Sequence, residues 1–442
     1  MKRQRVVITG MGAVTPLGLT VCEMWEGLTG GTCGIGPITA FDPVGFTCKV
    51  AGQVPDFDIR KNVPKSHRKA TKLMSRDIEL SILAANEALA SSGIVTKGID
   101  AENVNVDPTR VAINIGAGLI SCDLVELAPA VAASITEGKF DIRKWGGDGL
   151  GLVTPLWLLK YLPNMLACHI GIVHDIQGPS NTITCAEAAS HIAMAEATDV
   201  ISRGASDIAL AGGAEAKVNP IVMIRQCLTG RATSEGNDDP SSACRPFDGE
   251  AKGSVFGEAA GVVVLESLDH AVGRGAEIYA EVIGTGSSNS INHPYEHIEA
   301  DGQGIRVAIE KALDDAEIKG SDLDLIIPHG TGIPGDDMAE AKAIETVLGG
   351  AVGDVPVWPT KSMLSNTGAA CGGVDTIAAV CAIRDGVIPA AQNFGQSAEG
   401  CNLKIVTEVV EKPLRHVLCC SYTYGGQTAA IVLRKFDAEA GE

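Results

Sequence analysis

The sequence predicts an α/β protein made of two similar halves. Short runs of β-branched residues alternate with alanine-rich helical segments along the chain. A strand that ends in closely spaced glycines occurs at residues 6–12 and again at residues 279–286, which indicates an internal duplication. The chain has 442 residues, of which 45% are hydrophobic and 52 are glycines, so it is too long for one ordinary core and suits dense packing. We therefore expect one half over residues 1–266 and the other over residues 267–442.

The individual elements follow from local composition. Apolar runs rich in β-branched residues predict buried strands at residues 6–9, 111–116, 181–185, 207–214, 325–328 and 416–420. Alanine-rich or amphipathic segments predict helices at residues 78–92, 186–197 and 305–316. Residues 119–151 look irregular, and residues 155–166 carry more apolar surface than one helix face can bury. We interpret the latter run as a dimer contact or a substrate-tunnel wall, with ordinary core as the alternative.

Charge and the N-terminus exclude several classes of function. A net charge of −19 argues against nucleic acid as the main partner, although it leaves room for a local basic patch that binds an acidic or phosphorylated carrier. The first fifteen residues contain charged residues and a short strand rather than a signal peptide, and no apolar run reaches transmembrane length. We therefore expect a cytoplasmic protein that does not enter a membrane.

Neither a metal nor a cofactor is expected. The thirteen cysteines are scattered and form no CxxC pair, which is typical of reduced, buried thiols. Gly10 and Gly12 lack the third glycine and the acidic residue of a dinucleotide-binding motif. The polar clusters at residues 293–297 and at Asp336 and Asp337 are better explained by loop polarity than by an ion site.

The stretch from Gly178 to Ser190 carries the central question about function. A predicted strand turns sharply into a predicted helix here, and such a turn exposes one side chain to the positive end of the helix. Many α/β enzymes place their nucleophile at a turn of this kind. Cys185 and Glu187 compete for that position, and local features alone favour Cys185.

Three further loops carry candidate site residues. A predicted strand delivers His329 into a loop of glycine, threonine and proline, where Nε2 of a rigidly held yet accessible ring could donate to a thioester or carboxylate oxygen; a strand-capping histidine is the alternative. Lys361 lies in a polar loop before a helix of small residues, and Glu340 is a candidate partner for it. Gly425 and Gly426 could aim backbone N–H groups at an oxyanion, with a plain hairpin turn as the alternative.

Motifs in a regular order along nearly the whole chain carry a family resemblance. The matching stretches are residues 7–12, 15–18, 178–180, 211–215, 245–248, 256–261, 329–332, 361–363 and 424–426. Together they resemble the β-ketoacyl-acyl-carrier-protein synthases of type II fatty acid and polyketide synthesis. The resemblance implies a thiolase-like fold, in which two duplicated halves with mixed sheets pack around two central helices as five α/β/α/β/α layers.

The resemblance also implies a mechanism and partners. In that family a cysteine at the strand-to-helix turn accepts an acyl group from a carrier protein, and two histidines help to decarboxylate a malonyl unit whose carbanion attacks the thioester. His329 matches the first histidine and Lys361 matches a supporting lysine. Expected partners are an acyl carrier protein with phosphopantetheine-linked acyl or malonyl groups, and a second chain in a homodimer or in a heterodimer with an active ketosynthase. The residues expected to bind substrate are Tyr424, which matches the gate of the acyl pocket, Gly425, Gly426 and Thr331.

Two positions depart from the family pattern. Counting from the flanking motifs puts Glu187, not Cys185, in the place of the nucleophile, and puts Asn366 in the place of the second histidine. Placing Cys185 there needs a two-residue slip that the following helix would have to absorb. A buried carboxylate is expected to have a raised pKa unless Lys361 or His329 offsets burial. An asparagine can donate a hydrogen bond to an oxyanion but cannot shuttle a proton at neutral pH.

These departures lead to two main hypotheses. The first is a non-condensing subunit similar to the chain-length factors of type II polyketide synthases, which lack the nucleophile and shape the product tunnel of an active synthase. The second is an enzyme in its own right, either a malonyl-carrier decarboxylase or a divergent acyltransferase or 3-oxoacyl synthase that uses Glu187 or Cys185. A structural or regulatory homologue that binds acyl chains without catalysis is a third alternative.

Overall fold

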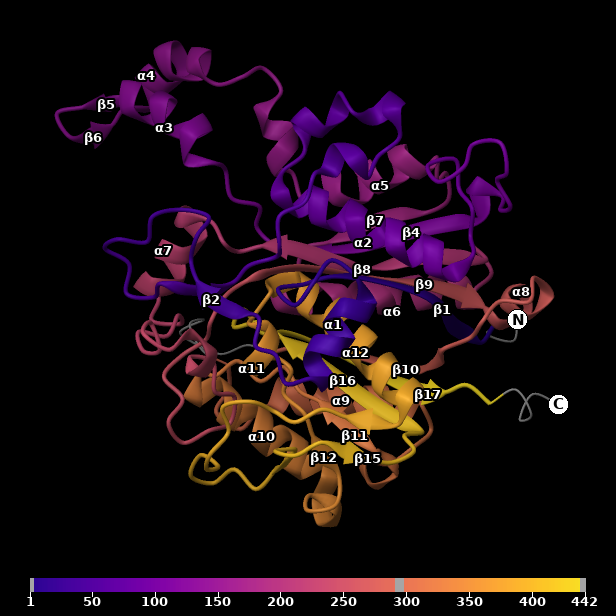
Figure 1. The fold of residues 1–442 in the computed structure, drawn as a ribbon. Coiled ribbons are helices and arrows are strands. Elements are labelled where there is room, and N and C mark those ends of the chain that lie inside the picture. The colour runs from indigo at the N-terminus through magenta and orange to yellow at the C-terminus, as the bar shows by residue number, and fades with distance from the viewer. Residues whose placement is uncertain (1–3, 291–297, 438–442) are drawn as a thin grey trace.

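A sheet of eleven strands runs through the protein. The structure, a computed structural model, describes residues 4–290 and 298–437 (Figure 1). The strands lie in the order β14-β12-β11-β16-β17-β10-β1-β9-β8-β4-β7. Their bounds are β1 (Val6–Val14), β4 (Val111–Ala117), β7 (Ser180–Ile183), β8 (Ile208–Ala216), β9 (Glu258–Ser267), β10 (Ala280–Asn289), β11 (Leu325–Ile327), β12 (Pro356–Val357), β14 (Lys404–Ile405), β16 (His416–Tyr422) and β17 (Gln427–Lys435).

The order of strands confirms the predicted duplication. From β1 outward the first half reads β1-β9-β8-β4-β7, and from β10 outward the second half reads β10-β17-β16-β11-β12. In both series the first two pairings are antiparallel and the next two are parallel. The pairing of β1 with β9 shifts register between Ile8 and Gly10, and the pairing of β10 with β17 shifts between Val282 and Gly284. The boundary between residues 266 and 267 stays a prediction.

Helices cover both halves and separate them. Figure 1 shows α6 and α12 between the two parts of the sheet, with α2 and α5 beyond one part and α9 and α10 beyond the other. These are the five layers that the resemblance predicts. Their bounds are α2 (Arg76–Ser92), α5 (Met165–His174), α6 (Ala189–Ser202), α9 (Gln303–Asp315), α10 (Pro334–Leu348) and α12 (Cys371–Asp385). Shorter elements include α1 (Val21–Thr29), α7 (Pro220–Leu228), α8 (Leu268–Gly273), the buried α11 (Lys361–Leu364) and the strand pair β2 (Ile35–Pro37) and β3 (Val50–Gly52).

Glycines let an outer helix approach each first strand closely. A Cβ on Gly12 of β1 would lie 2.0 Å from the carbonyl oxygen of Ala84 in α2. A Cβ on Gly286 of β10 would lie 2.0 Å from the carbonyl oxygen of Ala308 in α9. The same packing device therefore serves both halves, which explains why the glycine pattern repeats in the sequence.

The prediction of a buried strand at residues 181–185 was wrong. β7 ends at Ile183 and forms the outer edge of the sheet, where it pairs only with β4. Ser180 and Asn181 are exposed because no strand covers their free edge in the single chain. The predicted helix at 186–197 begins as a short 3₁₀ turn at Ala186–Ala188 and continues as α6.

An arm, which we define as residues 119–162, stands away from the body of the molecule. It contains α3 (Leu124–Ala133), the hairpin of β5 (Ile135–Thr136) and β6 (Lys139–Phe140), α4 (Ile142–Lys144) and a 3₁₀ turn at Trp157–Tyr161. Figure 1 shows α3, α4, β5 and β6 projecting beyond the layered body. Val125 is 87% exposed, Ile142 69% and Leu158 53%. Within residues 155–166, Leu156 and Leu158 are exposed whereas Tyr161 and Leu166 are buried, so ordinary core describes only part of that run.

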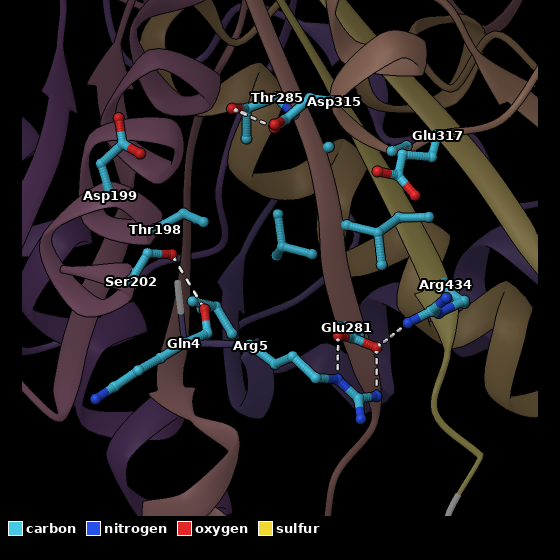
Figure 2. Close-up of a pocket in the computed structure, with 15 residues that line it drawn as sticks. Gln4, Arg5, Thr198, Asp199, Ser202, Glu281, Thr285, Asp315, Glu317 and Arg434 are labelled. Atoms are coloured by element: carbon cyan, nitrogen blue, oxygen red, sulfur yellow. Dashed lines mark hydrogen bonds and ion pairs between the residues drawn. The ribbon is translucent and has the colours of Figure 1, made fainter. Parts of the chain in front are cut away.

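A charged seam joins the halves where β1 meets β10. Arg5 donates to both carboxylate oxygens of Glu281 at 2.8 and 2.9 Å, and Arg434 donates to one of them at 2.7 Å (Figure 2). We call these three residues the seam cluster. Beside them lies a pocket of about 300 Å³ that is also lined by Asp199 and Glu317. Across the described ranges, no helix combines the length and the apolar character needed to cross a bilayer.

Candidate active site

Glu187 lies just after a strained turn between β7 and α6. Ala186 adopts a φ of +43°, a left-handed conformation that residues with a side chain rarely take. The side chain of Glu187 is then buried, with 4% exposed. Cys185, before the turn, is half-buried, and burial raises the pKa of its thiol. The geometry thus puts Glu187 rather than Cys185 among the charged groups of the interior.

Lys217 is the buried ion-pair partner of Glu187. Its Nζ lies 3.6 Å from Oε1 of Glu187 and 3.2 Å from Oε1 of Glu215. We call Lys217, Glu187 and Glu215 the Lys217 cluster. The other oxygen of Glu215 accepts a hydrogen bond from the backbone N–H of Ala369 at 2.7 Å. Sequence reasoning missed Lys217, although a lysine two residues beyond the Ala-Gly-Gly-Ala-Glu motif was a visible signal.

The cluster decides the protonation state of Glu187. Burial by itself would raise the pKa of this carboxyl, but Lys217 and Arg231 outweigh burial and hold the pKa below its ordinary value. The expectation that Lys361 or His329 would provide the offset was wrong, because Lys217 is the nearer cation. Burial by itself would lower the pKa of Lys217, but Glu215 and Glu187 keep this pKa above its ordinary value. Both partners are therefore charged at neutral pH.

His329 follows β11 and is locked in place through its backbone. Glu340 accepts the backbone N–H groups of His329 and Gly330 at 2.7 and 2.8 Å. The ring is 1% exposed and packs edge-on against Tyr422, with centroids 4.7 Å apart. It is rigidly held as predicted but not accessible in the single chain. Burial, with the charge of Lys361 next in importance, holds its pKa well below the ordinary value, so the imidazole is neutral.

Lys361 pairs with Asp375 and not with Glu340. Nζ of Lys361 donates to Asp375 on α12 at 3.0 Å, and both side chains are 2% exposed. The predicted partner Glu340 was wrong because its two oxygens are used by the His329 loop. Burial alone would lower the pKa of Lys361, but Asp375 keeps it above its ordinary value. The lysine is a fixed cation between the two central helices and the second half of the sheet.

Asn366 is wholly buried beside the same helix. Its backbone N–H donates to Val255 at 2.7 Å, and its Oδ1 accepts from the backbone of Gly368 at 3.0 Å. The Nδ2 group has no hydrogen-bond partner. Sγ of Cys371 lies 3.6 Å from Oδ1 of Asn366. The charges of Lys361 and Glu187 both act on the thiol of Cys371. Asn366 and Cys371 therefore lie beside each other near the start of α12, within reach of the charges of Lys361 and Glu187.

The glycine-rich segment near the C-terminus forms the hairpin turn between β16 and β17. Gly426 has a φ of +97° and donates its N–H to the carbonyl of Thr423 at 2.8 Å, so the alternative of a hairpin turn describes its geometry. Tyr424 is 43% exposed and lies under the guanidinium of Arg231, 4.8 Å from the ring centroid. The substrate-binding roles of Tyr424, Gly425 and Gly426 stay predictions.

Polar residues beyond His329 serve the loop itself. Thr331 is buried and donates its hydroxyl to Asp337 at 2.9 Å, and its role toward substrate stays a prediction. Asp337 also accepts the backbone N–H of Phe247 at 2.9 Å, while Asp336 pairs with Arg231 at 2.8 Å. Both aspartates are thus accounted for by internal bonds. The cluster at residues 293–297 lies outside the described residues.

Unpartnered polar atoms occur at this site, as they do at other places in the core. Among the residues that the structure describes, Oε2 of Glu187, Nδ1 of His329 and Nδ2 of Asn366 are buried without a hydrogen-bond partner. Buried polar atoms are usually paired, so such groups are typical of a site that a ligand completes. The set offers a carboxylate acceptor, a neutral imidazole and an amide donor, beside the fixed cations of Lys217 and Lys361. It can bind and polarise a carbonyl, but it holds no thiolate.

Known proteins resemble the chain over nearly its whole length. The sequence matches the N-terminal domain of beta-ketoacyl synthases over residues 3–271 and their C-terminal domain over residues 279–395. It is 33% identical to 3-oxoacyl-[acyl-carrier-protein] synthase 2 of Vibrio cholerae, over 98% of this chain and 100% of the relative. The corresponding protein of Staphylococcus aureus is 31% identical, over 99% and 100% of the two chains.

Solved structures agree with the sequence comparison. The ishigamide ketosynthase/chain length factor superposes with a TM-score of 0.83 at 29% identity and covers 98% of this chain and 100% of its own. A beta-ketoacyl synthase from Burkholderia phymatum superposes with a TM-score of 0.85 at 25% identity, again over 98% and 100% of the two chains. With the duplicated sheet, the two central helices and these matches, the chain belongs to the β-ketoacyl synthase family.

Proposed function

We propose that this protein is a non-condensing subunit that pairs with an active ketosynthase in type II fatty acid or polyketide synthesis and shapes its product. The observation that carries the proposal is Glu187, a buried carboxylate paired with Lys217 where the resemblance places the nucleophilic cysteine. A carboxylate could hold an acyl group only as a mixed anhydride, which is a poor carrier compared with a thioester. The similarity to the ketosynthase/chain length factor structure supports the same role.

The second departure supports the loss of condensation. Asn366 occupies the position of the second histidine, and its amide cannot accept and return a proton at neutral pH. Its Nδ2 can only donate a hydrogen bond. Condensation needs both an acylated nucleophile and a decarboxylated malonyl unit, so two independent parts of that chemistry are missing. A binding and shaping role needs neither.

Two exposed features support pairing with a second ketosynthase-type chain. The free edge of β7, with Ser180 and Asn181 exposed, presents backbone groups that another strand can pair with. The arm exposes apolar side chains such as Val125 and Ile142 that a monomer rarely leaves in water. We expect the partner ketosynthase to cover both surfaces.

A basic surface supports an acyl carrier protein as the second partner. We define the basic patch as the exposed lysines and arginines of a segment of three short 3₁₀ turns. They are Arg60, Lys61, Lys65, Arg68, Lys69 and Lys72. Because the whole chain carries a charge of −19, this concentration of positive charge is unusual and suits an acidic partner. One similar structure, at 25% identity, is a ketosynthase in complex with a type II polyketide acyl carrier protein.

The pairing and the lack of acylation are tested together. The chain is co-expressed with an active ketosynthase from the same source, and the complex is examined by native mass spectrometry. It is then incubated with acyl- and malonyl-carrier protein, and the intact mass of each subunit is measured. We expect a heterodimer whose acyl group sits only on the ketosynthase. A homodimer of this chain in the presence of the ketosynthase, or an acyl group mapping to Cys185, would overturn the proposal.

The basic patch is tested by charge reversal. The triple variant K65E/R68E/K69E is expected to bind the carrier protein at least tenfold more weakly, with the difference shrinking at high salt. The variant K319E changes an exposed lysine in the other half and serves as the control. Equal binding by both variants in surface plasmon resonance would show that the carrier docks elsewhere.

A second candidate function is decarboxylation of malonyl-carrier thioesters. The observation that favours it is the pair of a neutral His329 and a free Nδ2 donor on Asn366, which could both stabilise an enolate oxygen. Carbon dioxide release from labelled malonyl-carrier protein measures this activity. The rate of carbon dioxide release should fall at least tenfold in H329A and should change in E187Q, whereas C185A should leave it unchanged. A rate that is the same in H329A and E187Q as in the unchanged protein would come from another protein and would refute this candidate function.

A further inference from the structure

We propose that Lys217 is a positioning residue that fixes Glu187 as a permanently ionised carboxylate, so that the site accepts hydrogen bonds and excludes anionic acyl groups. The inference rests on the proposed function, because it takes Glu187 as the group in the nucleophile's place. It goes further by naming the residue on which the altered site depends and the ligand class that the site rejects.

The geometry of the Lys217 cluster is specific. Lys217 lies just beyond β8, so its side chain reaches Glu187 on the turn before α6 and Glu215 at the end of β8. Its side chain is 6% exposed, and Nζ also lies 5.7 Å from the centre of the Phe256 ring. The shortest distance from the lysine to Glu187 is to Oε1, and Oε2 has no hydrogen-bond partner within the described part of the chain. One oxygen is thus held and the other remains available as an acceptor.

The space for the cluster depends on two glycines. A Cβ on Gly118 would lie 2.2 Å from Oε1 of Glu215. A Cβ on Gly368, whose φ is +61°, would lie 2.2 Å from Cε of Lys217. Neither glycine can carry a side chain while the lysine and the glutamate keep their places. The backbone on both sides is therefore shaped to the cluster, which a chance surface ion pair would not require.

The charges around Glu187 come from several elements. Lys217 follows β8 and Arg231 follows α7, and both stabilise the carboxylate. Cys371 of α12 lies in the same field, and burial, as the largest cause, raises the pKa of its thiol to about 11, so it is neutral. Glu215 opposes the ionisation of Glu187 but is itself paired to Lys217 and to the backbone of Ala369. Arg231 is already bonded to Asp336. Lys217 is therefore the cation on which Glu187 depends most.

An ionised Glu187 restricts what can bind. It accepts hydrogen bonds and cannot donate one, so the ligand atom beside Oε2 is a donor or a water molecule. The carboxylate of a malonyl group placed there would lie beside a like charge in a medium of low dielectric constant, which disfavours its binding. The site should therefore favour neutral acyl-pantetheine groups over malonyl-pantetheine groups.

The ionisation is tested by carboxyl carbon NMR on protein labelled with ¹³C at the glutamate side chains, with E187Q used to assign the signal. In the unchanged protein we expect the Glu187 signal to stay that of a carboxylate down to pH 4.5, the ordinary value of its pKa. In K217M we expect the signal of a protonated carboxyl at pH 7. K217R should restore the carboxylate, and E215Q, which keeps the Lys217–Glu187 pair, should retain it.

Binding provides the second readout. The unchanged protein should bind a neutral acyl-carrier protein at least tenfold more tightly than malonyl-carrier protein, and this preference should shrink in E187Q. If K217M does not fold, the titration of the unchanged protein decides: a Glu187 signal that titrates at or above pH 4.5 overturns the inference. So does a K217M spectrum identical to that of the unchanged protein. Failure to form a heterodimer would refute the proposed function alone and leave these spectra unaffected.

Discussion

The protein contains two compact charge clusters that differ in one respect. The seam cluster sets two arginines against Glu281, and both carboxylate oxygens are hydrogen-bonded. The Lys217 cluster sets one lysine against two glutamates, and Oε2 of Glu187 is left without a partner. Glu281 and Glu187 are almost equally buried, at 3% and 4% exposure. Burial of charge alone therefore does not distinguish a structural cluster from a functional one.

The two clusters differ in how completely their carboxylates are hydrogen-bonded. In the seam cluster the bonds hold β1, β10 and β17 together. Burial of Glu281 opposes its ionisation, but its hydrogen bonds from two partly exposed arginines outweigh burial. The site has orphaned atoms on Glu187, His329 and Asn366, which cost stability unless a ligand or water meets them. We expect the first region to serve stability and the second to serve binding, and four predictions test this contrast.

The largest effect is expected when Lys361 loses its counter-charge. D375N leaves a wholly buried ammonium group beside a neutral amide, and we expect a loss of about 3–5 kcal/mol in the free energy of unfolding. Urea denaturation measures the loss. The double variant K361M/D375L replaces the pair with apolar side chains and should recover most of it. A D375N protein as stable as the original would show that the pair does not support the site.

A smaller loss is expected at the seam. E281Q removes the negative charge that two arginines share, and because both arginines are about 35–40% exposed, water can solvate them. We expect a loss of about 1.5–3 kcal/mol in unfolding free energy, without any change in carrier-protein binding. Denaturant titration and a binding assay on the same variant check both parts. A change in carrier-protein binding would mean that the seam cluster is energetically coupled to the binding site.

The pH dependence of the seam follows from the same residue. Burial would raise the pKa of Glu281, but its hydrogen bonds from Arg5 and Arg434 hold it below its ordinary value of 4.5. A lowered carboxyl pKa contributes stability that is present above pH 4.5 and is lost as the pH falls through the folded-state value. The difference in Tm between the unchanged protein and E281Q should therefore have its full size at pH 7 and become smaller below pH 4.5. A constant difference would contradict this assignment.

The smallest effect is expected at the predicted gate. Arg231 lies over the ring of Tyr424, which is 43% exposed, so the cation–π contact is worth about 0.5–1 kcal/mol. Y424L should lose that amount, whereas Y424F keeps the ring and should lose almost none. Chemical denaturation compares the two variants. If Y424L changes acyl-group selectivity while Y424F does not, the gating role predicted from the resemblance gains direct support.

Much of the fold could be predicted from the sequence because it depends on local patterns. The glycine pairs at residues 10 and 12 and at residues 284 and 286 recur because each first strand must let a helix approach closely, and the residue type at such a contact is visible in any sequence. The order and spacing of the family motifs also predicted that Glu187, rather than Cys185, follows the strained turn. The local pattern alone gave the opposite answer, since a cysteine at the end of an apolar run looks like a nucleophile.

The partners of the charged residues were decided by tertiary structure. Glu340 was the candidate partner of Lys361 because a lysine beside buried apolar residues needs one, yet α12 brings Asp375 to Lys361 and the His329 loop uses Glu340. Lys217 meets Glu187 only because β8 and the turn before α6 end side by side. The β-branched residues of β7 predict a buried strand, but β7 lies at the edge of the sheet, where part of it is exposed. The amino-acid sequence determines which side chains carry charge, whereas the packing of distant elements determines which of them are buried and which of them meet.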